Sequence, residues 1–440
     1  MRCSLIVLLI MTFLLSSLYA DITFLKIYET IDGWAAPFDV IETSNGGYVC
    51  TTNSINWTFL RTDEYGEVLV QDNRLWGYSL CENQNEELVT AYDSFTGGDY
   101  LINIDWADLM GNVLRTRVYD ELSYYEDISQ YCIIQTSDRG YAICGEMEFH
   151  DKGYVMKLDS LENYQWHVVL PDASLYSIVE DSENCLIAGG ASSMDYVIKL
   201  SQEGGIIWEN TYPCSSTTWR IWGIEVTSSG YVFASISGRV VGISSSGSFE
   251  WQYETAIPEI MYIDVCIAEN GDVVACGMDN ESGVLTRLNN NGDLVWEKEY
   301  ESCRLGYIYS TADSGFVSTG IYTAVEPPDN DDILLLKVDS EGNCESLGIE
   351  TEPELNNAQL FPVYPNPFSE SAIIRYALTE SGAVSISVFD VSGRLVSSPV
   401  DCISAAGAYS FTMNDLPSGV YMIRMRVSGH ELVQRFVVID

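Results

Sequence analysis

Histidine is the first residue type to examine for chemistry, because it titrates near neutral pH and serves most often as an acid, a base or a metal ligand. The 440-residue chain has three histidines, His150, His167 and His430, each in a different sequence context. No GxSxG, HExxH or P-loop motif is present. Because no neighbouring group would orient a histidine, we predict no histidine-based catalytic site, and the sequence assigns no catalytic residue.

Carboxylates are abundant, with 64 Asp and Glu against 21 Lys and Arg and a net charge of −43. A glycosidase-type pair would be hidden among them, since no spacing singles one out. The acidic turns at 288–293, 326–332 and 339–343 offer the oxygen ligands that calcium prefers, but ordinary turn chemistry explains the same residues. We therefore predict no cofactor and leave calcium open. The charge itself excludes nucleic acid and anionic lipid as partners, because both would be repelled.

Eleven of the 12 cysteines lie after residue 20. Cys132 and Cys144 bracket one turn and Cys266 and Cys276 another, so each pair could face across a hairpin. No CxxC spacing indicates zinc or redox chemistry. Because free cysteine is among the most buried residue types, we predict small core residues here.

Residues 1–20 have the pattern of a signal peptide: Arg2, an apolar run over 5–15, and small residues ending at Ala20. The run is shorter than the 20 or so residues that span a bilayer. No later segment is long enough, so we expect an exported chain without a transmembrane anchor.

Internal repeats indicate the elements that would position any site. LSQEGGIIWENTY (200–212) and LNNNGDLVWEKEY (288–300) share Leu, Gly, Trp, Glu and Tyr at matching positions. A turn followed by a short apolar strand also recurs about every 45 residues, within the range of known repeat units. Its seven copies are anchored at Tyr48, Leu88, Tyr141, Cys185, Tyr231, Asp272 and Phe316.

Each copy predicts four short strands with Gly, Asn, Asp or Ser turns between them. Four strands per 40–45 residues is typical of a β-propeller blade. We therefore predict an all-β chain with a seven-bladed propeller over 21–347. The segment 21–29 resembles a fourth strand, which the seventh copy lacks, so we expect it to complete the last blade and remove two free sheet edges.

A tryptophan four residues after the turn glycine recurs at Trp208, Trp251 and Trp296, and Trp166 takes this place where Glu162 replaces the glycine. We expect these rings to pack between neighbouring blades. The GxxxW spacing resembles the docking repeat of pyrroloquinoline-quinone-type propellers. That resemblance covers a few residues per blade and implies the fold; no cofactor-binding set accompanies it, so a quinone-dependent dehydrogenase is the weakest functional hypothesis.

An acidic linker is predicted at 348–360, followed by a small immunoglobulin-like β-sandwich at 361–440. The sandwich resembles the C-terminal sorting domain of type IX secretion substrates. The resemblance rests on these motif residues: Tyr364, Pro365, Asn366, Pro367, Gly393, Arg394, Gly419 and Tyr421. It implies the type IX machinery as a partner, and an extracellular or outer-membrane-surface location in a Gram-negative bacterium.

Trp219 and Trp222 lie between blade copies, where loops reach a propeller face, and are the candidate ligand contacts. Burial at the start of the next blade would explain them as well. We expect a non-enzymatic binding protein whose ligand is an extracellular glycan or protein. The alternative is a secreted polysaccharide-active enzyme with carboxylates on one propeller face.

Overall fold

The computed structural model describes residues 22–438 except 29, 31–35, 55–57, 126, 149–151, 214–219, 280–281, 324–330, 345–357, 361–362, 364–370, 379–380, 391–393, 406, 415 and 428–429. The predicted leader, 1–20, therefore lies outside the described residues. The chain divides into two compact units, Met1–Ser346 and Leu347–Asp440. Among the described residues, no helix has the length and apolar character needed to cross a bilayer.

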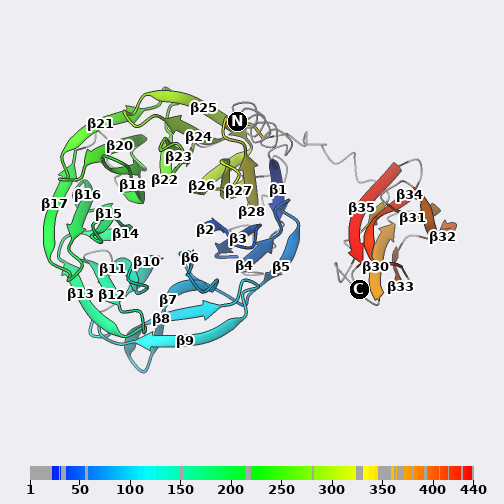
Figure 1. Cartoon of the computed structure of the whole chain (residues 1–440), viewed down its shortest axis with the longest axis horizontal. Coiled ribbons are helices and arrows are strands. Elements are labelled where there is room, and N and C mark those ends of the chain that lie inside the picture. The colour runs from blue at the N-terminus through cyan, green and yellow to red at the C-terminus, as the bar shows by residue number, and fades with distance from the viewer. Residues whose placement is uncertain are drawn as a thin grey trace, which may run out of the picture. The chain divides into compact units, whose positions relative to one another are not determined.

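Seven four-stranded antiparallel sheets surround a central channel in the first unit, as the seven-blade prediction requires (Figure 1). From the channel outward, the first four blades are β2 (Pro37–Glu42) to β5 (Val68–Asp72), β6 (Leu80–Glu82) to β9 (Val113–Tyr119), β10 (Ser129–Gln135) to β13 (Tyr164–Leu170), and β14 (Ser174–Glu180) to β17 (Ile206–Tyr212). The next two are β18 (Ile221–Val226) to β21 (Phe249–Glu254) and β22 (Met261–Ile267) to β25 (Leu294–Glu301). The last consists of β26 (Cys303–Ser310), β27 (Phe316–Thr323), β28 (Asp331–Val338) and β1 (Phe24–Tyr28).

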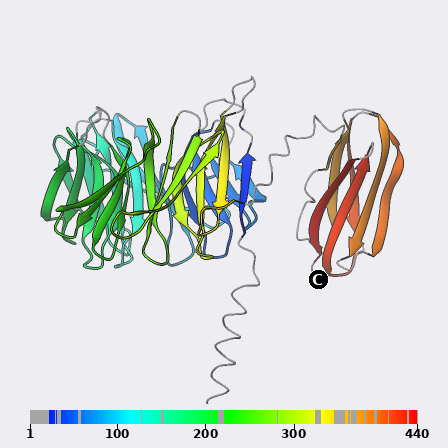
Figure 2. The ribbon, with the colours of Figure 1, turned by 90° about the horizontal axis from the view of Figure 1, so that it is seen from above.

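The strand at the start of the chain closes the ring. β1 pairs with β28 in antiparallel register, from Phe24 opposite Lys337 to Tyr28 opposite Ile333. This confirms the prediction from the sequence, and the closure leaves no blade with a missing outer strand. Side-on, the strands of all blades run along the channel axis (Figure 2).

The repeated tryptophans hold neighbouring blades together, as predicted. The indole Nε1 atoms of Trp166, Trp208 and Trp296 each donate to a carbonyl of the next blade, at 3.0, 3.1 and 3.2 Å. The rings lie against the glycine of that blade's turn, where a Cβ would come within 3.0 Å of the indole. The tyrosine of the same motif adds a second bond: Tyr212 Oη donates to the Gly247 carbonyl at 2.7 Å.

One blade interface replaces this tryptophan–glycine contact with an ion pair. Arg115 of β9 occupies the tryptophan position, and Glu162 the turn position of the next blade. The Arg115 Nη2 and Glu162 Oε1 atoms are 2.7 Å apart, and the guanidinium stacks 4.6 Å above the buried Trp106 ring. Arg115 and Glu162 thus stand in the places of the tryptophan and the glycine, and a side-chain contact still joins the two blades.

A buried cation in the third strand of several blades pairs with an aspartate of the first turn. Lys157, Lys199 and Lys337 lie 2.9, 2.8 and 2.9 Å from Asp138, Asp181 and Asp313, and Arg287 lies 2.9 Å from Asp272. We call these the turn ion pairs. In each pair the aspartate carboxylate neutralises the buried basic residue near the end of the third strand.

The described cysteines form no disulfide. Cys132 and Cys144 lie opposite each other in register, whereas Cys266 faces Val274 and Cys276 faces Asp264, so only the first pair faces across its hairpin. Of the described cysteines, Cys402 alone is exposed. The prediction of small core residues is confirmed for Cys144, Cys266 and Cys276, whereas Cys132 is half-buried and lines the channel.

The second unit is a two-sheet sandwich. One sheet contains β29 (Ala358–Leu360), β30 (Ser371–Leu378) and β33 (Gly407–Asn414); the other contains β32 (Leu395–Ser404), β31 (Gly382–Asp390), β34 (Gly419–Val427) and β35 (His430–Val438). Residues 358–360 of the predicted linker therefore form an edge strand of the sandwich.

The predicted sorting motif is described in part. Tyr421 stacks on Phe436 and donates to the Pro417 carbonyl at 2.8 Å, and the Arg394 amide donates to Asp390 at 3.1 Å in the β31–β32 hairpin. Gly419 begins β34. Tyr364, Pro365, Asn366, Pro367 and Gly393 lie outside the described residues.

Candidate functional site

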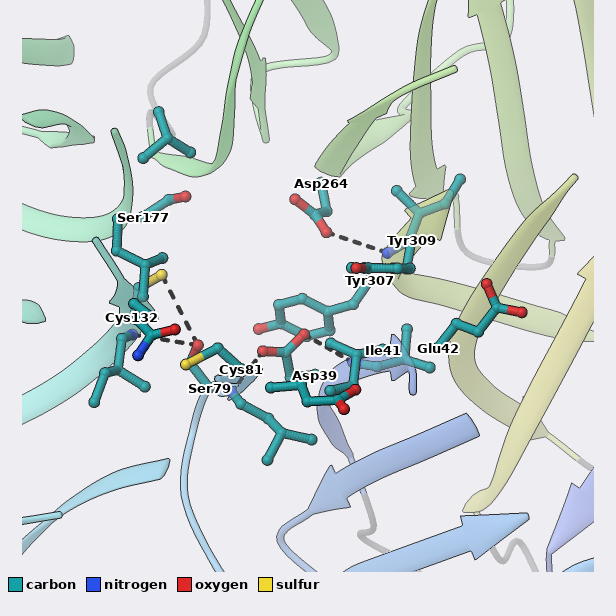
Figure 3. A pocket seen from close by; sticks show the side chains of 18 of the residues that line it. Asp39, Ile41, Glu42, Ser79, Cys81, Cys132, Ser177, Asp264, Tyr307 and Tyr309 are labelled. Carbon is teal, nitrogen blue, oxygen red and sulfur yellow. Dashed lines mark hydrogen bonds between the residues drawn. The ribbon is translucent and has the colours of Figure 1, made fainter. Parts of the chain in front are cut away.

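The first strands of the seven blades line a channel cavity of about 1190 Å³ (Figure 3). These strands have no neighbour on the channel side, so their side chains and free backbone groups form the wall. A cavity of this size that contains aromatic rings and convergent polar groups is the default candidate for a binding site.

A β-bulge near the start of the first strand shapes one mouth of this channel. The register shifts by one residue in six blades, and the extra residue is Phe38, Tyr131, Tyr176, Trp222, Ile263 or Gly306. In the remaining blade Tyr78 precedes β6 at the corresponding place. A bulge bends its strand and redirects a side chain, which here brings an aromatic ring to the mouth in four of the six bulged blades.

These rings form a continuous arc that we call the aromatic crescent: Phe38, Tyr78, Tyr131, Tyr176 and Trp222. Successive centroids are 4.5, 5.6, 5.0 and 4.6 Å apart, within the range of favourable aromatic pairs. Four of the rings are half-buried, and Tyr176 is buried. The crescent therefore offers a prearranged aromatic surface across five consecutive blades.

Two charged side chains fix the central rings of the crescent. Buried Glu146 accepts hydrogen bonds from Tyr131 Oη at 2.6 Å and from Tyr176 Oη at 3.2 Å. Burial, reinforced by this carboxylate, raises the pKa of Tyr176 to about 12. The guanidinium of exposed Arg220 lies 5.6 Å from the Tyr176 ring centroid. These contacts limit the rotation of the rings before any ligand arrives.

Below the crescent, two aspartates bridge neighbouring blades (Figure 3). Asp39 accepts from the amides of Val40 and Leu80, both at 2.8 Å. Asp264 likewise accepts from Val265 at 2.9 Å and from Ile308 at 3.1 Å. Each carboxylate thus satisfies an amide of its own strand and one of the next blade, which an inner edge strand would otherwise leave to water.

Among the described residues, no cation forms an ion pair with Asp39, Glu225 or Asp264. Burial raises the pKa of Asp39 and of Glu225 to about 7, and raises that of Asp264 well above its usual value. Glu225 accepts only a long bond from the Val226 amide, 3.4 Å, among the contacts of the described residues. No lysine, arginine or histidine lines this cavity in the described part of the chain.

The structure brings one predicted ligand contact to this site: Trp222 lies in the crescent, whereas Trp219 falls outside the described residues. The other members of the crescent and the channel carboxylates were missed. A signal existed, since in five blades an aromatic residue followed by a small or polar one lies near the start of the first strand. The histidines stay apart from the channel as far as they are described: His167 lies on outer strand β13 and bonds Tyr164 at 3.0 Å.

The acidic turns considered for calcium use their oxygens to cap backbone amides. Asn289 Oδ1 accepts from Asn291 and Asp293 at 2.9 and 3.0 Å, and Asp339 Oδ1 accepts from Glu341 and Asn343 at 2.9 and 2.7 Å. Most of the third turn, 326–330, lies outside the described residues. These bonds are ordinary turn chemistry.

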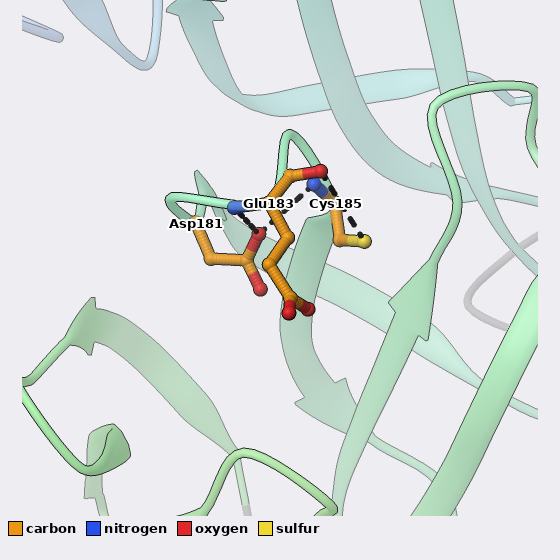
Figure 4. Close-up of side chains that lie close together, drawn as sticks. All are labelled: Asp181, Glu183 and Cys185. Atoms are coloured by element: carbon orange, nitrogen blue, oxygen red, sulfur yellow. Dashed lines mark hydrogen bonds between the residues drawn. The ribbon is translucent and has the colours of Figure 1, made fainter.

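A further acidic group, Asp181, Glu183 and Cys185, places its ligand atoms within 4.8 Å of one another (Figure 4). Lys199 Nζ lies 2.8 Å from Asp181 and 3.3 Å from Glu183. Burial would raise the pKa of Asp181, but hydrogen bonds from Lys199 and from neighbouring amides lower it overall. The ammonium supplies the positive charge that a metal would bring, so this group belongs to a turn ion pair.

Comparison with known proteins identifies the second unit. Residues 362–439 match the secretion system C-terminal sorting domain family. This domain indicates a type IX substrate, a secreted protein outside or on the surface of a Bacteroidetes-type cell. No curated protein matches the chain significantly.

Solved structures similar to this chain are propellers or share its fold at low identity. Virginiamycin B lyase from Staphylococcus aureus has a TM-score of 0.53 at 14% identity, over 72% of this chain and 99% of that one. A streptogramin B lyase structure gives 0.50 at 14% identity, over 71% and 97%. BBS1N, solved in complex with ARL6DN, gives 0.52 at 8% identity, over 74% and 99%. Likeness at these identities shows the fold alone.

Proposed function

We propose that this chain is a secreted, non-enzymatic binding protein that captures carbohydrate on the aromatic crescent. The observation that carries the proposal is the recurrence of an aromatic residue near the start of the first strand in five consecutive blades around one channel mouth, four of them at a β-bulge. A fold alone implies no activity, so the argument rests on this surface. The sorting domain supports it by placing the protein where extracellular glycans occur.

Half-buried aromatic rings suit sugars because the apolar face of a pyranose stacks on them while its hydroxyls remain near polar groups. The ring-to-ring contacts of the crescent and the Glu146 bonds order these side chains in advance. Little conformational entropy is then lost on binding, which favours affinity. The arc is long enough for several rings in sequence, so an oligosaccharide fits better than a monosaccharide.

The experiment is a binding panel of soluble polysaccharides against the purified secreted chain, measured by calorimetry. Trp222→Ala should weaken binding by roughly ten-fold or more, because truncating a central aromatic contact costs about 2 kcal/mol or more. Phe249→Ala is the matched control, since Phe249 is 54% exposed on outer strand β21. Equal affinity of Trp222→Ala and the wild-type protein for every bound glycan would overturn the proposal.

A second candidate function is polysaccharide cleavage by the channel carboxylates. The observation in its favour is the pKa of about 7 for Asp39 and Glu225, which lets a carboxyl group hold a proton at neutral pH, as a general acid must. Against it, both oxygens of Asp39 bond backbone amides. New reducing ends that disappear in Glu225→Gln would favour cleavage over simple binding.

A further inference from the structure

The described lining of the channel is charged with one sign only. Its titratable acids are six carboxylates and it has no basic side chain: Asp39, Glu42, Glu82, Glu86, Glu225 and Asp264. Elsewhere in the propeller, cations do pair with carboxylates, as the turn ion pairs show. The missing positive charge is therefore a property of the cavity itself and not of the whole propeller.

The spacing of these carboxylates argues against a bare metal ion as the ligand of the channel. Metal sites gather three or more oxygen or sulfur ligands within a few ångströms. Among the described residues the one such group is Asp181, Glu183 and Cys185, outside the channel and already neutralised by Lys199. The channel carboxylates are instead distributed over several blades and levels, which suits a long organic cation.

One ring of the crescent shows that its faces attract a cation. The guanidinium of Arg220, which does not line the channel, lies 5.6 Å from the Tyr176 ring centroid. The negative face of an aromatic ring attracts a cation, and the energy is larger where water is excluded. The faces of the other rings and the channel carboxylates therefore both favour a positive charge on a ligand.

We propose that the ligand is an amine-bearing sugar polymer, with sugar rings on the aromatic crescent and protonated amines toward the channel carboxylates. This inference rests on the carbohydrate-binding function proposed above and adds the charge of the substrate. The field of a chain with net charge −43 would also attract such a polymer and repel acidic polysaccharides.

The test compares two oligosaccharide series of equal length and linkage, β-linked glucosamine oligomers with free amines and the same oligomers N-acetylated. Binding to the full secreted chain is measured by calorimetry at about pH 7, where an amine remains protonated and the carboxyl groups of Asp39 and Glu225 are partly ionised. We expect the free-amine series to bind roughly ten-fold tighter, and the advantage to shrink with added salt because exposed charges are screened.

Glu225→Gln should reduce the ratio of free-amine affinity to acetylated affinity several-fold. Glu250→Gln is the matched control, because Glu250 lies exposed on outer strand β21 of the same blade. The salt dependence of the wild-type protein tests the same point without any variant.

The outcomes separate the two proposals. Equal or tighter binding of the acetylated series overturns the amine preference but leaves carbohydrate capture intact. No binding of either series, with no effect of Trp222→Ala on any glycan, overturns both. Tight binding of oligolysine with no sugar bound assigns the channel to a basic peptide and overturns the sugar proposal.

Discussion

The propeller contains two sets of carboxylates. Those of the turn ion pairs contact a buried cation, whereas Asp39, Glu225 and Asp264 in the channel form no ion pair with a described residue. In the turns, Asp181 faces buried Lys199 at 2.8 Å, and its pKa lies below the usual value. In the channel, Glu225 has no such partner, and burial raises its pKa to about 7. The same residue type thus stabilises the blade in one place and leaves a charge available to a ligand in the other.

The largest effect should come from breaking a turn ion pair. In Lys199→Met, Asp181 stays buried without its cation, so the free energy of unfolding should fall by about 3 kcal/mol, the cost typical of a broken buried pair. Urea denaturation measures the change. The control is Lys26→Met, whose partner Glu67 is 66% exposed and which should cost less than about 1 kcal/mol. Equal losses of unfolding free energy in the two variants would show that a turn ion pair stabilises the protein no more than an exposed pair does.

Removing the unpaired carboxylate of Glu225 from the channel should stabilise the protein. Glu225 has a folded pKa of about 7, above that of an unfolded chain, so the folded state holds the extra proton and stability falls as pH rises from about 4 to about 7. Glu225→Gln removes this loss and should raise the free energy of unfolding by about 2 kcal/mol at pH 8, with little gain at pH 5. Urea midpoints at the two pH values test it, and a gain of equal size at both would refute the assignment.

Affinity for a cation should follow the same titration. A permanently charged, trimethylated glucosamine oligomer should bind several-fold tighter at pH 8 than at pH 6, because Asp39 and Glu225, with pKa values of about 7, lose protons over this range. The facing thiols of Cys81 and Cys132, with pKa values raised by burial to about 12, remain neutral, as does Tyr307, whose pKa burial also raises. Calorimetry measures the trend; a flat or falling affinity would exclude a role for these groups.

The smallest effect concerns the blade interface that uses an ion pair where the next interface along the chain uses tryptophan and glycine. Arg115→Trp and Glu162→Gly should each destabilise the protein, whereas the double variant rebuilds the common contact and should recover about 1 kcal/mol relative to additivity. A double-mutant cycle from unfolding curves gives this coupling. Strict additivity would show that the two positions do not act as a pair.

The fold was accessible from the sequence because its determinants repeat. The Gly–Trp–Tyr motif of 200–212 and 288–300 corresponds to the same contacts at both of its blade interfaces, and β1 carries the pattern of the strand missing from the last blade. The sequence left open which cysteines face each other, because this depends on the exact register of a hairpin. Cys266 pairs with Val274 and not with Cys276, which lies two residues further along β23.

The candidate site was less accessible because no single stretch contains it. Trp222 was identified as an aromatic in a loop region, but Phe38, Tyr78, Tyr131 and Tyr176 meet it only after the ring closes. The raised pKa values of Asp39 and Glu225 likewise come from burial among seven blades. Aligning the first strand of each repeat, in addition to the second and fourth, would have revealed the aromatic column.

The closing strand β1 also affects how the propeller resists a pulling force. The second unit begins at Leu347, shortly after β28 ends at Val338, so a pull on that unit reaches the propeller through β28. β28 is bonded on one side to β27 and on the other to β1. Tension along the strand must shear two ladders of hydrogen bonds at once, because antiparallel bonds lie across the direction of pulling. β1 therefore doubles the number of hydrogen-bond ladders that resist extraction of β28 from the ring.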